Sequence, residues 1–314
     1  MLVSVIIPSF KIDSYSDLVD AIDSLLTQSY TNIEVIIVIH TSKKLYEEIV
    51  KAYGAQNKLK VVFNERSLGA YAARNVGIKA AHGDILAFLD DDAVADEKWV
   101  ENLVNTYQEI DAMAVGGKIL PIWLPRKPAY FPEELYWLVG VTHKGFAEDK
   151  IIEVRNAFGP NMSFKREVFE QVGLFNENLG FARRGTSYIQ AGEAEFSLRM
   201  TGKFGVGVIY NPEAIVRHKI PVSKARLRLL LKRSFYQGYS KVLLDKLGPS
   251  PNPISTEKSH LKDLLIKYIP QRGKKVFTGP DRVAQIKQLL VLVCSIVAVG
   301  LGFMYGHIRQ IKIK

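Results

Sequence analysis

The first part of this chain alternates β-branched apolar runs with segments that carry apolar residues at helical spacing. Val3–Pro8 and Ile33–Ile39 are such runs, and Ser16–Gln28 between them places leucine and isoleucine on one helical face. A strand, helix, strand unit of this kind joins parallel neighbours in a sheet. The same alternation predicts further helices and strands at Leu45–Tyr53, Lys60–Phe63, Ala70–Ala81 and Asp84–Leu89. The sequence therefore predicts an α/β fold with a mostly parallel sheet and flanking helices.

Polar or acidic residues follow each predicted strand, at Pro8-Ser9, His40-Thr41, Asn64-Glu65 and Asp90-Asp91-Asp92. The carboxyl ends of the strands line the ligand crevice of an open α/β sheet, so we expect these four endings to meet at one site. No Gly-x-Gly-x-x-Gly motif follows a strand, which removes the main support for a dinucleotide-binding domain.

Three adjacent carboxylates, Asp90, Asp91 and Asp92, follow the apolar run that ends at Leu89. They repel one another unless they share a cation. Oxygen ligands of this kind suit Mg²⁺ or Mn²⁺, which keep coordination positions free for substrate phosphates. The alternative interpretation is a solvated acidic turn before a helix that starts near Asp96.

Five segments in order carry a family resemblance: VSVIIPSF near the start, NERSLGAYAARNVGI at 64–78, FLDDDAVAD at 88–96, GPNMSFKREVFEQVGLFNENLG at 159–180 and GEAEFSLRM at 192–200. From residue 3 to about residue 240 the chain resembles the family 2 glycosyltransferases of the GT-A fold, a Rossmann-like fold that binds nucleotide-diphospho-sugars. The resemblance implies a nucleotide-sugar donor whose diphosphate is bridged by a divalent metal, Mn²⁺ or Mg²⁺.

The same resemblance assigns residues to the donor and the metal. On the donor side it places Pro8, His40, Arg74, Asp84, Asp90 and Asp91; on the metal it places Asp92 and His218. Relatives usually carry an aspartate at the position of His40, where it hydrogen-bonds the nucleotide base. A neutral imidazole still offers one donor or one acceptor to a base edge. For His218 the alternative is a structural histidine.

Glu193 is the predicted general base, because transfer with inversion needs one carboxylate near the acceptor hydroxyl. The family motif has two adjacent acids here, whereas this chain has Gly192-Glu193 followed by Glu195. The alternative is a helix N-terminus at which acidic residues favour the helix dipole.

Acceptor-binding residues are predicted in three segments. They are Trp123 and Trp137 in an aromatic-rich stretch at 121–140, Asn161 and Met162 in the Asn-Met-Ser motif at 161–163, and Arg233 in a basic helix at 226–244. Amphipathic aromatics suit a membrane boundary or an isoprenoid groove, and arginine suits a phosphate. The aromatic stretch also resembles enzymes that extend polyisoprenyl-phosphate-linked sugars, such as glucosyl-dolichyl phosphate glucuronosyltransferases. The alternatives are a buried helical insertion and a solvated basic helix.

Charge is divided unevenly along the chain. Residues 1–218 have a net charge of −5, and residues 219–314 have 19 Lys and Arg against four acidic residues, a net charge of +15. This division favours an anionic membrane partner for the C-terminal third and argues against nucleic-acid binding. The single cysteine, Cys294, excludes an intramolecular disulfide and fits a reducing compartment.

The segment Leu289–Tyr305 contains 17 residues without a charge, and extending it to Ile286–Ile308 makes it long enough for a membrane helix. We expect a single-pass or peripheral membrane protein. Basic residues near the segment favour its N-terminal side, so the catalytic domain is expected on the cytoplasmic face. The predicted organisation is a catalytic domain at 1–240, basic amphipathic helices at 241–285, the hydrophobic helix at 286–308 and a basic tail at 309–314.

Together these observations predict a metal-dependent inverting glycosyltransferase that moves a sugar from a nucleotide-sugar to a lipid-linked saccharide acceptor in glycan assembly. The alternatives are a polyisoprenyl-phosphate monosaccharide synthase, a cell-surface polysaccharide transferase, and a catalytically degenerate membrane scaffold.

Overall fold

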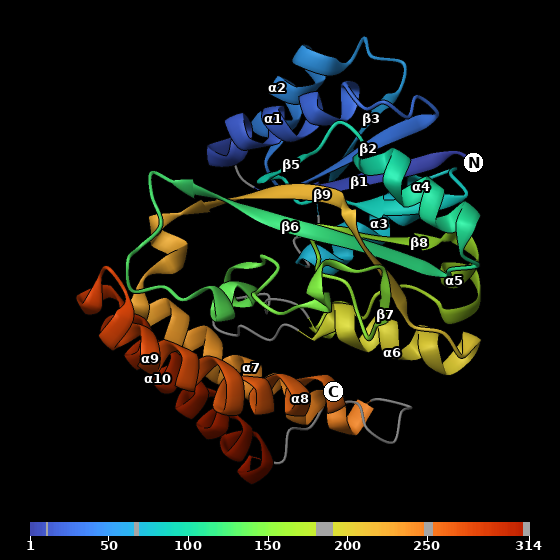
Figure 1. Cartoon of the computed structure of the whole chain (residues 1–314). Helices are drawn as coiled ribbons and strands as arrows, with labels where there is room; N and C mark the ends of the chain where they lie inside the picture. The colour runs from blue at the N-terminus through green and yellow to red at the C-terminus, as the bar shows by residue number, and fades with distance from the viewer. Residues whose placement is uncertain (11, 66–68, 180–190, 248–253, 310–314) are drawn as a thin grey trace.

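A mixed β-sheet organises the molecule (Figure 1), which is a computed structural model describing residues 1–10, 12–65, 69–179, 191–247 and 254–309. The sheet has nine strands in the order β3-β2-β1-β4-β8-β6-β9-β5, with β7 paired to β9 outside this path. The predicted α/β fold is confirmed. Parallel pairing is confined to β1 through β4 and to the β6–β9 pair.

The parallel part comes from the predicted alternation. Its elements are β1 (Val3–Ser9), α1 (Tyr15–Leu26), β2 (Ile33–His40), α2 (Lys43–Tyr53), β3 (Leu59–Asn64), α3 (Ala70–Ala80) and β4 (Ile85–Phe88). Strands β1, β2 and β4 are buried almost throughout, as expected where helices cover both faces of a sheet.

The second part of the sheet mixes directions. Its elements are β5 (Ala93–Ala95), α4 (Trp99–Glu109), β6 (Ala114–Leu124), β7 (Ile152–Val154), β8 (Met162–Lys165), α5 (Arg166–Val172), α6 (Gly192–Phe204) and β9 (Val208–Pro221). Strand β8 runs antiparallel to both β4 and β6, and β9 runs antiparallel to β5. Short 3-10 segments connect these elements at Ile12–Ser14, Glu133–Val139, Ala147–Asp149, Glu177–Leu179 and Val222–Ala225.

Each face of the sheet has its own hydrophobic core, because successive strand residues point to opposite faces. Val5 and Ile7 pack on one face with residues of α1, α2 and α4, whereas Ile6 packs on the other with residues of α3, α5 and α6. Figure 1 shows α1 and α2 above the sheet and α6 below it. The second core centres on clustered phenylalanine rings, including Phe164 and Phe196, whose centroids are 5.0 Å apart.

The C-terminal helices form a further layer beneath the sheet (Figure 1). They are α7 (Leu227–Leu247), α8 (Ser255–Asp263), a π-helical turn at Leu264–Tyr268, α9 (Ile269–Thr278) and α10 (Arg282–Ile308). Helix α7 crosses residue 240, where the sequence analysis places a domain boundary. A third core joins this layer to the aromatic-rich stretch; it contains Phe131, Leu135, Leu230, Tyr268 and Leu292.

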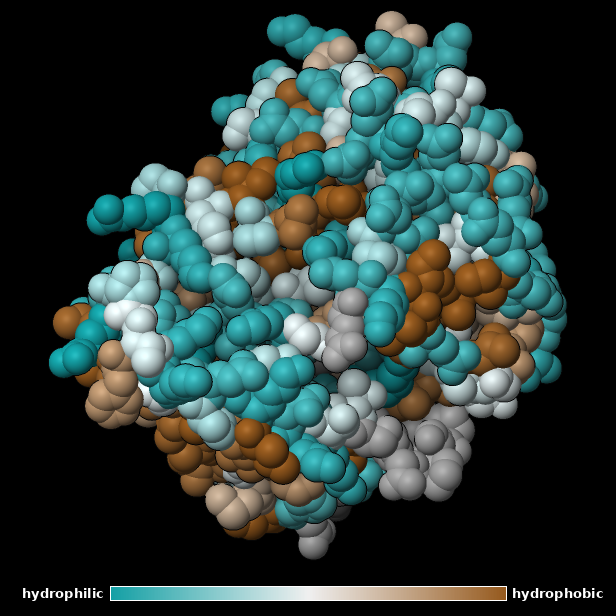
Figure 2. All heavy atoms as spheres, viewed as in Figure 1, coloured by the Kyte–Doolittle hydropathy of each residue, from teal (hydrophilic) through white to brown (hydrophobic). Residues whose placement is uncertain are grey.

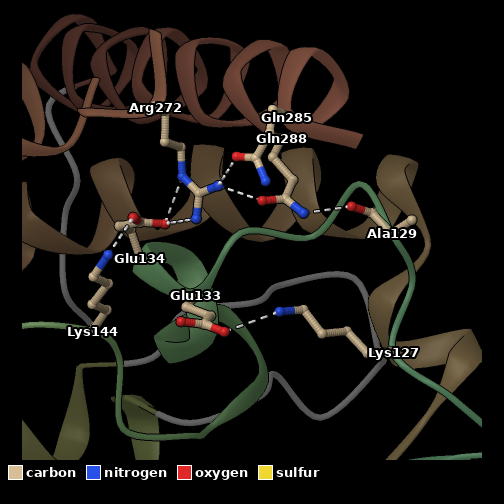
Figure 3. A network of polar contacts seen from close by, with 8 residues as sticks. All are labelled: Lys127, Ala129, Glu133, Glu134, Lys144, Arg272, Gln285 and Gln288. Carbon is tan, nitrogen blue, oxygen red and sulfur yellow. Dashed lines mark hydrogen bonds and ion pairs between the residues drawn. The ribbon is translucent and has the colours of Figure 1, made fainter. Parts of the chain in front are cut away.

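A buried polar network ties the aromatic-rich stretch to these helices (Figure 3). Glu134, 1% exposed, accepts hydrogen bonds from the Nε and Nη2 atoms of Arg272 at 3.0 and 2.5 Å. Arg272 also donates to Gln288 of α10, and Gln288 donates to the carbonyl of Ala129 at 2.7 Å. Removing one partner of a buried ion pair costs about 3–5 kcal/mol, so this network fixes α9 and α10 to the aromatic-rich stretch.

Glycines let α7 and α10 approach each other closely. A Cβ at Gly302 would lie 1.8 Å from the carbonyl oxygen of Phe235, and one at Gly238 would lie 1.9 Å from that of Val299. Gly300, on the same helix, has no atom within 4 Å of the corresponding position. The contact therefore depends on glycine at specific positions of the helix pair.

We expect Gly302→Ala to destabilise the α7–α10 contact by about 1–3 kcal/mol, because the helices must separate to admit the methyl group. Gly300→Ala is the matched control; it should be neutral or stabilising by up to about 1 kcal/mol through helix propensity. Thermal unfolding and limited proteolysis within α10 measure both effects. Equal stability of the two variants would contradict the close contact.

Candidate active site

Three adjacent carboxylates follow β4 and point toward three different partners. Asp90 Oδ1 accepts from Arg74 Nη2 at 2.9 Å, Asp91 Oδ2 accepts from the Ser9 hydroxyl at 2.6 Å, and Asp92 Oδ1 lies 2.9 Å from His218 Nε2. The backbone turn from Asp90 to Ala93, closed by a 3.1 Å hydrogen bond, spreads the three side chains. The acidic triplet is thus an organised part of the crevice and not a solvated turn.

Asp90, Asp92 and His218 form a candidate metal site, with ligand atoms within 4.8 Å of one another. His218 is delivered by β9, whose pairing with β5 places it opposite Ala93. Its Nδ1 lies 3.3 Å from the carbonyl of Gly140. When a neutral ring donates from Nδ1 to that carbonyl, the lone pair of Nε2 faces the Asp92 carboxylate. A proton on Nε2, or a cation bound between the two groups, removes this repulsion. Two carboxylates and one imidazole therefore fit a divalent ion such as Mn²⁺ or Mg²⁺.

Lys224 adds a second positive group at Asp92. It lies in the Val222–Ala225 segment directly after β9, and its ammonium contacts Asp92 Oδ2. Burial acts to raise the pKa of Asp92, but the charge and hydrogen bond of His218, together with Lys224, outweigh burial and lower that pKa. Asp92 is therefore held as a carboxylate.

Asp91 has the opposite electrostatic environment. Burial, followed by the negative charge of Asp92, raises the pKa of Asp91 to about 7, although the hydrogen bond from Ser9 opposes this shift. Perturbed pKa values cluster at functional sites, so the opposite pKa shifts of Asp91 and Asp92 support a functional role for the acidic turn.

Arg74 joins the acidic turn to the predicted base. Its side chain is almost fully buried; Nη2 contacts Asp90, and Nη1 donates to Glu193 Oε1 at 3.1 Å. The Tyr71 hydroxyl donates to the other oxygen, Glu193 Oε2. Tyr71 and Arg74 share one face of α3 because they are three residues apart.

Glu193 lies in the first turn of α6, where the helix N-terminus favours negative charge. Its side chain is 23% exposed, so two buried donors orient the carboxylate while part of it remains open to solvent. Gly159 passes close by: a Cβ there would lie 2.7 Å from Arg74 Nη2 and 2.9 Å from Glu193 Oε1. The adjacent acid, Glu195, instead holds Arg199 with a 2.6 Å hydrogen bond.

Two residues of the site were not predicted from the sequence: Tyr71 and Lys224. Tyr71 could have been found, since it shares a helical face with Arg74, and Ser9 was expected among the strand endings at the site. Lys224 carried no such signal, because its partner Asp92 is 132 residues away in the sequence.

Three predicted residues have other contacts in the structure. Asp84 precedes β4 and accepts a hydrogen bond from the Leu2 amide at 2.8 Å, so it lies at the opposite end of the strand from Asp90. Asn161 is fully buried. Its Oδ1 accepts a hydrogen bond from Trp99 Nε1, and its Nδ2 donates to the carbonyls of Lys118 and Ala214. Met162 packs in the hydrophobic core. Asn161 and Met162 are thus held within the fold, whereas Asp84 is exposed at the opposite end of β4. The roles predicted for these three residues stay predictions.

Three further predicted residues, His40, Pro8 and Arg233, also contact other parts of the protein. His40 is completely buried, and the Phe10 ring stacks on it at 5.0 Å, so the predicted contact of His40 with a base edge is not open here. Pro8 is buried within β1. Arg233 donates to the Leu138 carbonyl at 2.8 Å.

The two tryptophans predicted for the acceptor belong to the third core. Trp123 contacts the rings of Phe131 and Tyr136, and Trp137 packs partly buried beside them. The second half of the aromatic-rich stretch, from Phe131 to Val139, is thus mostly buried, whereas Leu124 and Arg126 in its first half are exposed. The acceptor role of Trp123 and Trp137 stays a prediction.

Comparison with protein families matches residues 4–173 to the model for glycosyl transferase family 2. The chain belongs to this family. The resemblance of its five motifs is thereby confirmed. A family member from Haloferax volcanii, a glucosyl-dolichyl phosphate glucuronosyltransferase, is 38% identical over 307 residues, which cover 98% of this chain and 96% of the relative.

Solved structures share the GT-A fold. A mannosyltransferase from Pyrobaculum calidifontis, in complex with GDP-Man and Mn²⁺, matches with a TM-score of 0.61 at 17% identity, over 94% of this chain and 86% of that chain. S. aureus TarS 1–349, in complex with UDP-GlcNAc, matches with a TM-score of 0.56 at 16% identity, over 95% and 82%. This glycosyltransferase therefore carries its carboxylates on a known scaffold.

We expect Mn²⁺ to raise the melting temperature of this glycosyltransferase, because a cation that binds only the folded state stabilises it by about 2.7 kcal/mol at a hundredfold excess over Kd. Asp92→Asn should abolish the shift. Asp84→Asn is the control that should keep it, since Asp84 lies at the other end of β4. Differential scanning fluorimetry gives the readout, and an equal loss in both variants would contradict the assigned metal site.

Proposed function

We propose that this family 2 glycosyltransferase transfers a sugar, with inversion, from a nucleotide-sugar to a polyisoprenyl-phosphate-linked saccharide. The observation that carries the proposal is the coupling of the acidic turn to Glu193 through Arg74. This coupling joins a group suited to the donor and a group suited to the acceptor in one crevice. The acceptor class rests on the Haloferax volcanii relative, whose name specifies glucosyl-dolichyl phosphate.

Asp92 and His218, with Asp90, would hold the divalent cation. When bound, that ion supplies positive charge for the diphosphate leaving group. Lys224 already contacts Asp92 and is placed to add charge at the same point. Arg74 donates a hydrogen bond to Asp90 and fixes the orientation of its carboxylate.

Glu193 would take the proton of the acceptor hydroxyl as that oxygen attacks the anomeric carbon from the face opposite the diphosphate. Tyr71 and Arg74 fix its two oxygens, so the carboxylate loses little orientational freedom when the acceptor arrives. An oriented base of this kind lowers the barrier by pre-positioning the reacting groups.

The acceptor is a lipid, so the reaction belongs at a membrane. We propose that the catalytic domain faces the cytoplasm, because basic residues that precede α10 are attracted to the anionic lipids of the cytoplasmic leaflet. This placement gives the enzyme access to soluble nucleotide-sugars.

The donor and the acceptor are tested together by supplying nucleotide-sugars one at a time with dolichyl-phosphate, glucosyl-dolichyl phosphate or a lipid-free glycan. Product mass is the readout. A disaccharyl lipid supports the proposal. A monosaccharyl lipid indicates a polyisoprenyl-phosphate synthase, an extended lipid-free glycan indicates a polysaccharide transferase, and no product with any donor indicates a scaffold.

Glu193→Gln should lower the transfer rate by about 100- to 10,000-fold, because the amide keeps the shape of the carboxylate and loses its basicity. Nucleotide binding, measured by calorimetry with Mn²⁺ present, should change little. Glu195→Gln is the matched control from the same helix turn. It weakens the contact with Arg199, so its cost should appear in stability rather than in the rate of the folded enzyme. Full activity of Glu193→Gln would exclude the base assignment.

A further inference from the structure

An exposed apolar stripe runs along the whole of α10. Its members are Val283, Ile286, Leu290, Val293, Val297, Leu301, Met304 and Ile308, all at least 41% exposed. At about 100° per residue they fall within an arc of about 80°. In Figure 2 apolar side chains gather along the lower edge of the molecule, where Figure 1 shows α10. A continuous apolar face of this extent needs a partner.

The opposite face of α10 packs against the catalytic domain. Val291 and Leu292 pack in the third core, and Gln288 donates to the Ala129 carbonyl near the start of the helix. Toward its end, Gly302 and Gly306 pack against α7. The helix is therefore attached to the domain along its length.

Helix α10 is long and apolar enough to cross a membrane by length and composition. A crossing would draw α7 into the hydrocarbon with it, because the two helices lie side by side. Helix α7 carries the exposed Lys232, together with Arg233 and Lys241, which bind the Leu138 carbonyl and Glu257. Charged side chains placed at the bilayer centre are costly. Crossing would thus either bury these charges in lipid or break the contacts of α10 with the domain.

The basic residues near the stripe indicate what kind of surface covers it. Basic residues close to the start of α10 are exposed, among them Lys274, Lys275, Arg282 and Lys287. Basic side chains of this kind are attracted to an anionic lipid surface. Exposed apolar side chains at Leu265, Ile266 and Phe277 lie in the neighbouring helical segments. An apolar stripe flanked by cations matches an anionic bilayer surface.

We propose that α10 lies in the plane of the membrane, with its stripe immersed in one leaflet and its opposite face bound to α7 and the third core. The enzyme is then a monotopic protein held on one leaflet. Immersion of such a helix reaches about 5–10 Å into the headgroup and acyl boundary. This arrangement concerns the anchor alone and holds whatever sugar the enzyme transfers.

The single cysteine makes a direct test possible. Cys294 is exposed on α10, so Cys294→Ala provides a background for single cysteines at Leu290, Val297 and Met304, each labelled with a nitroxide. The labelled full chain is reconstituted in phosphatidylcholine and phosphatidylglycerol vesicles, and accessibility to oxygen and to a water-soluble nickel complex gives depth. Ser295→Cys, on the buried face, is the control that should report protein packing with or without lipid.

An in-plane helix gives three similar shallow depths, all accessible to reagent from the outer side of the vesicles. A spanning helix instead places position 297 about 10 Å deeper than position 290, since seven residues rise about 1.5 Å each, and removes position 304 from outside access. That profile would overturn the proposal. So would labels that become immobilised without lipid, which would assign the stripe to a second copy of the chain.

Discussion

The site depends on the buried guanidinium of Arg74, which holds two carboxylates from distant parts of the chain. Asp90 follows β4 and Glu193 begins α6, and each contacts a different nitrogen of the same side chain. Without this group the two acids would repel each other across the crevice. Arginine suits the position because its planar fork presents fixed donors and keeps its charge when buried.

The mixed sheet explains how the other cations reach the acidic turn. In a series of parallel strands only the carboxyl ends face the ligand site, and the end of β4 supplies Asp90, Asp91 and Asp92. Strand β9 runs antiparallel to β5, which places His218 opposite Ala93 and leads the chain directly to Lys224. The positive side of the site thus comes from the part of the sheet in which strand direction changes.

The C-terminal layer connects this chemistry to the lipid. Helix α7 follows Lys224 closely and packs on α10, while Glu134 and Arg272 join the aromatic-rich stretch to α9. The catalytic crevice and the apolar stripe are therefore linked by one continuous set of packed helices. Aromatic residues of the stretch, such as Phe131, pack within this link, and the exposed apolar stripe lies on the outer face of α10.

Local patterns in the sequence determined the α/β class, the position of the acidic triplet and the family. These features follow from residue periodicity and from strand endings, which act over short distances. The tertiary structure alone decided the partners: that Arg74 bridges Asp90 and Glu193, that Lys224 reaches Asp92, and that Asp84 faces away. It also placed Asn161 and Met162 in buried positions, although they belong to a recognisable motif. Contacts between residues a hundred positions apart depend on strand order and direction, and neither leaves a local trace in the sequence.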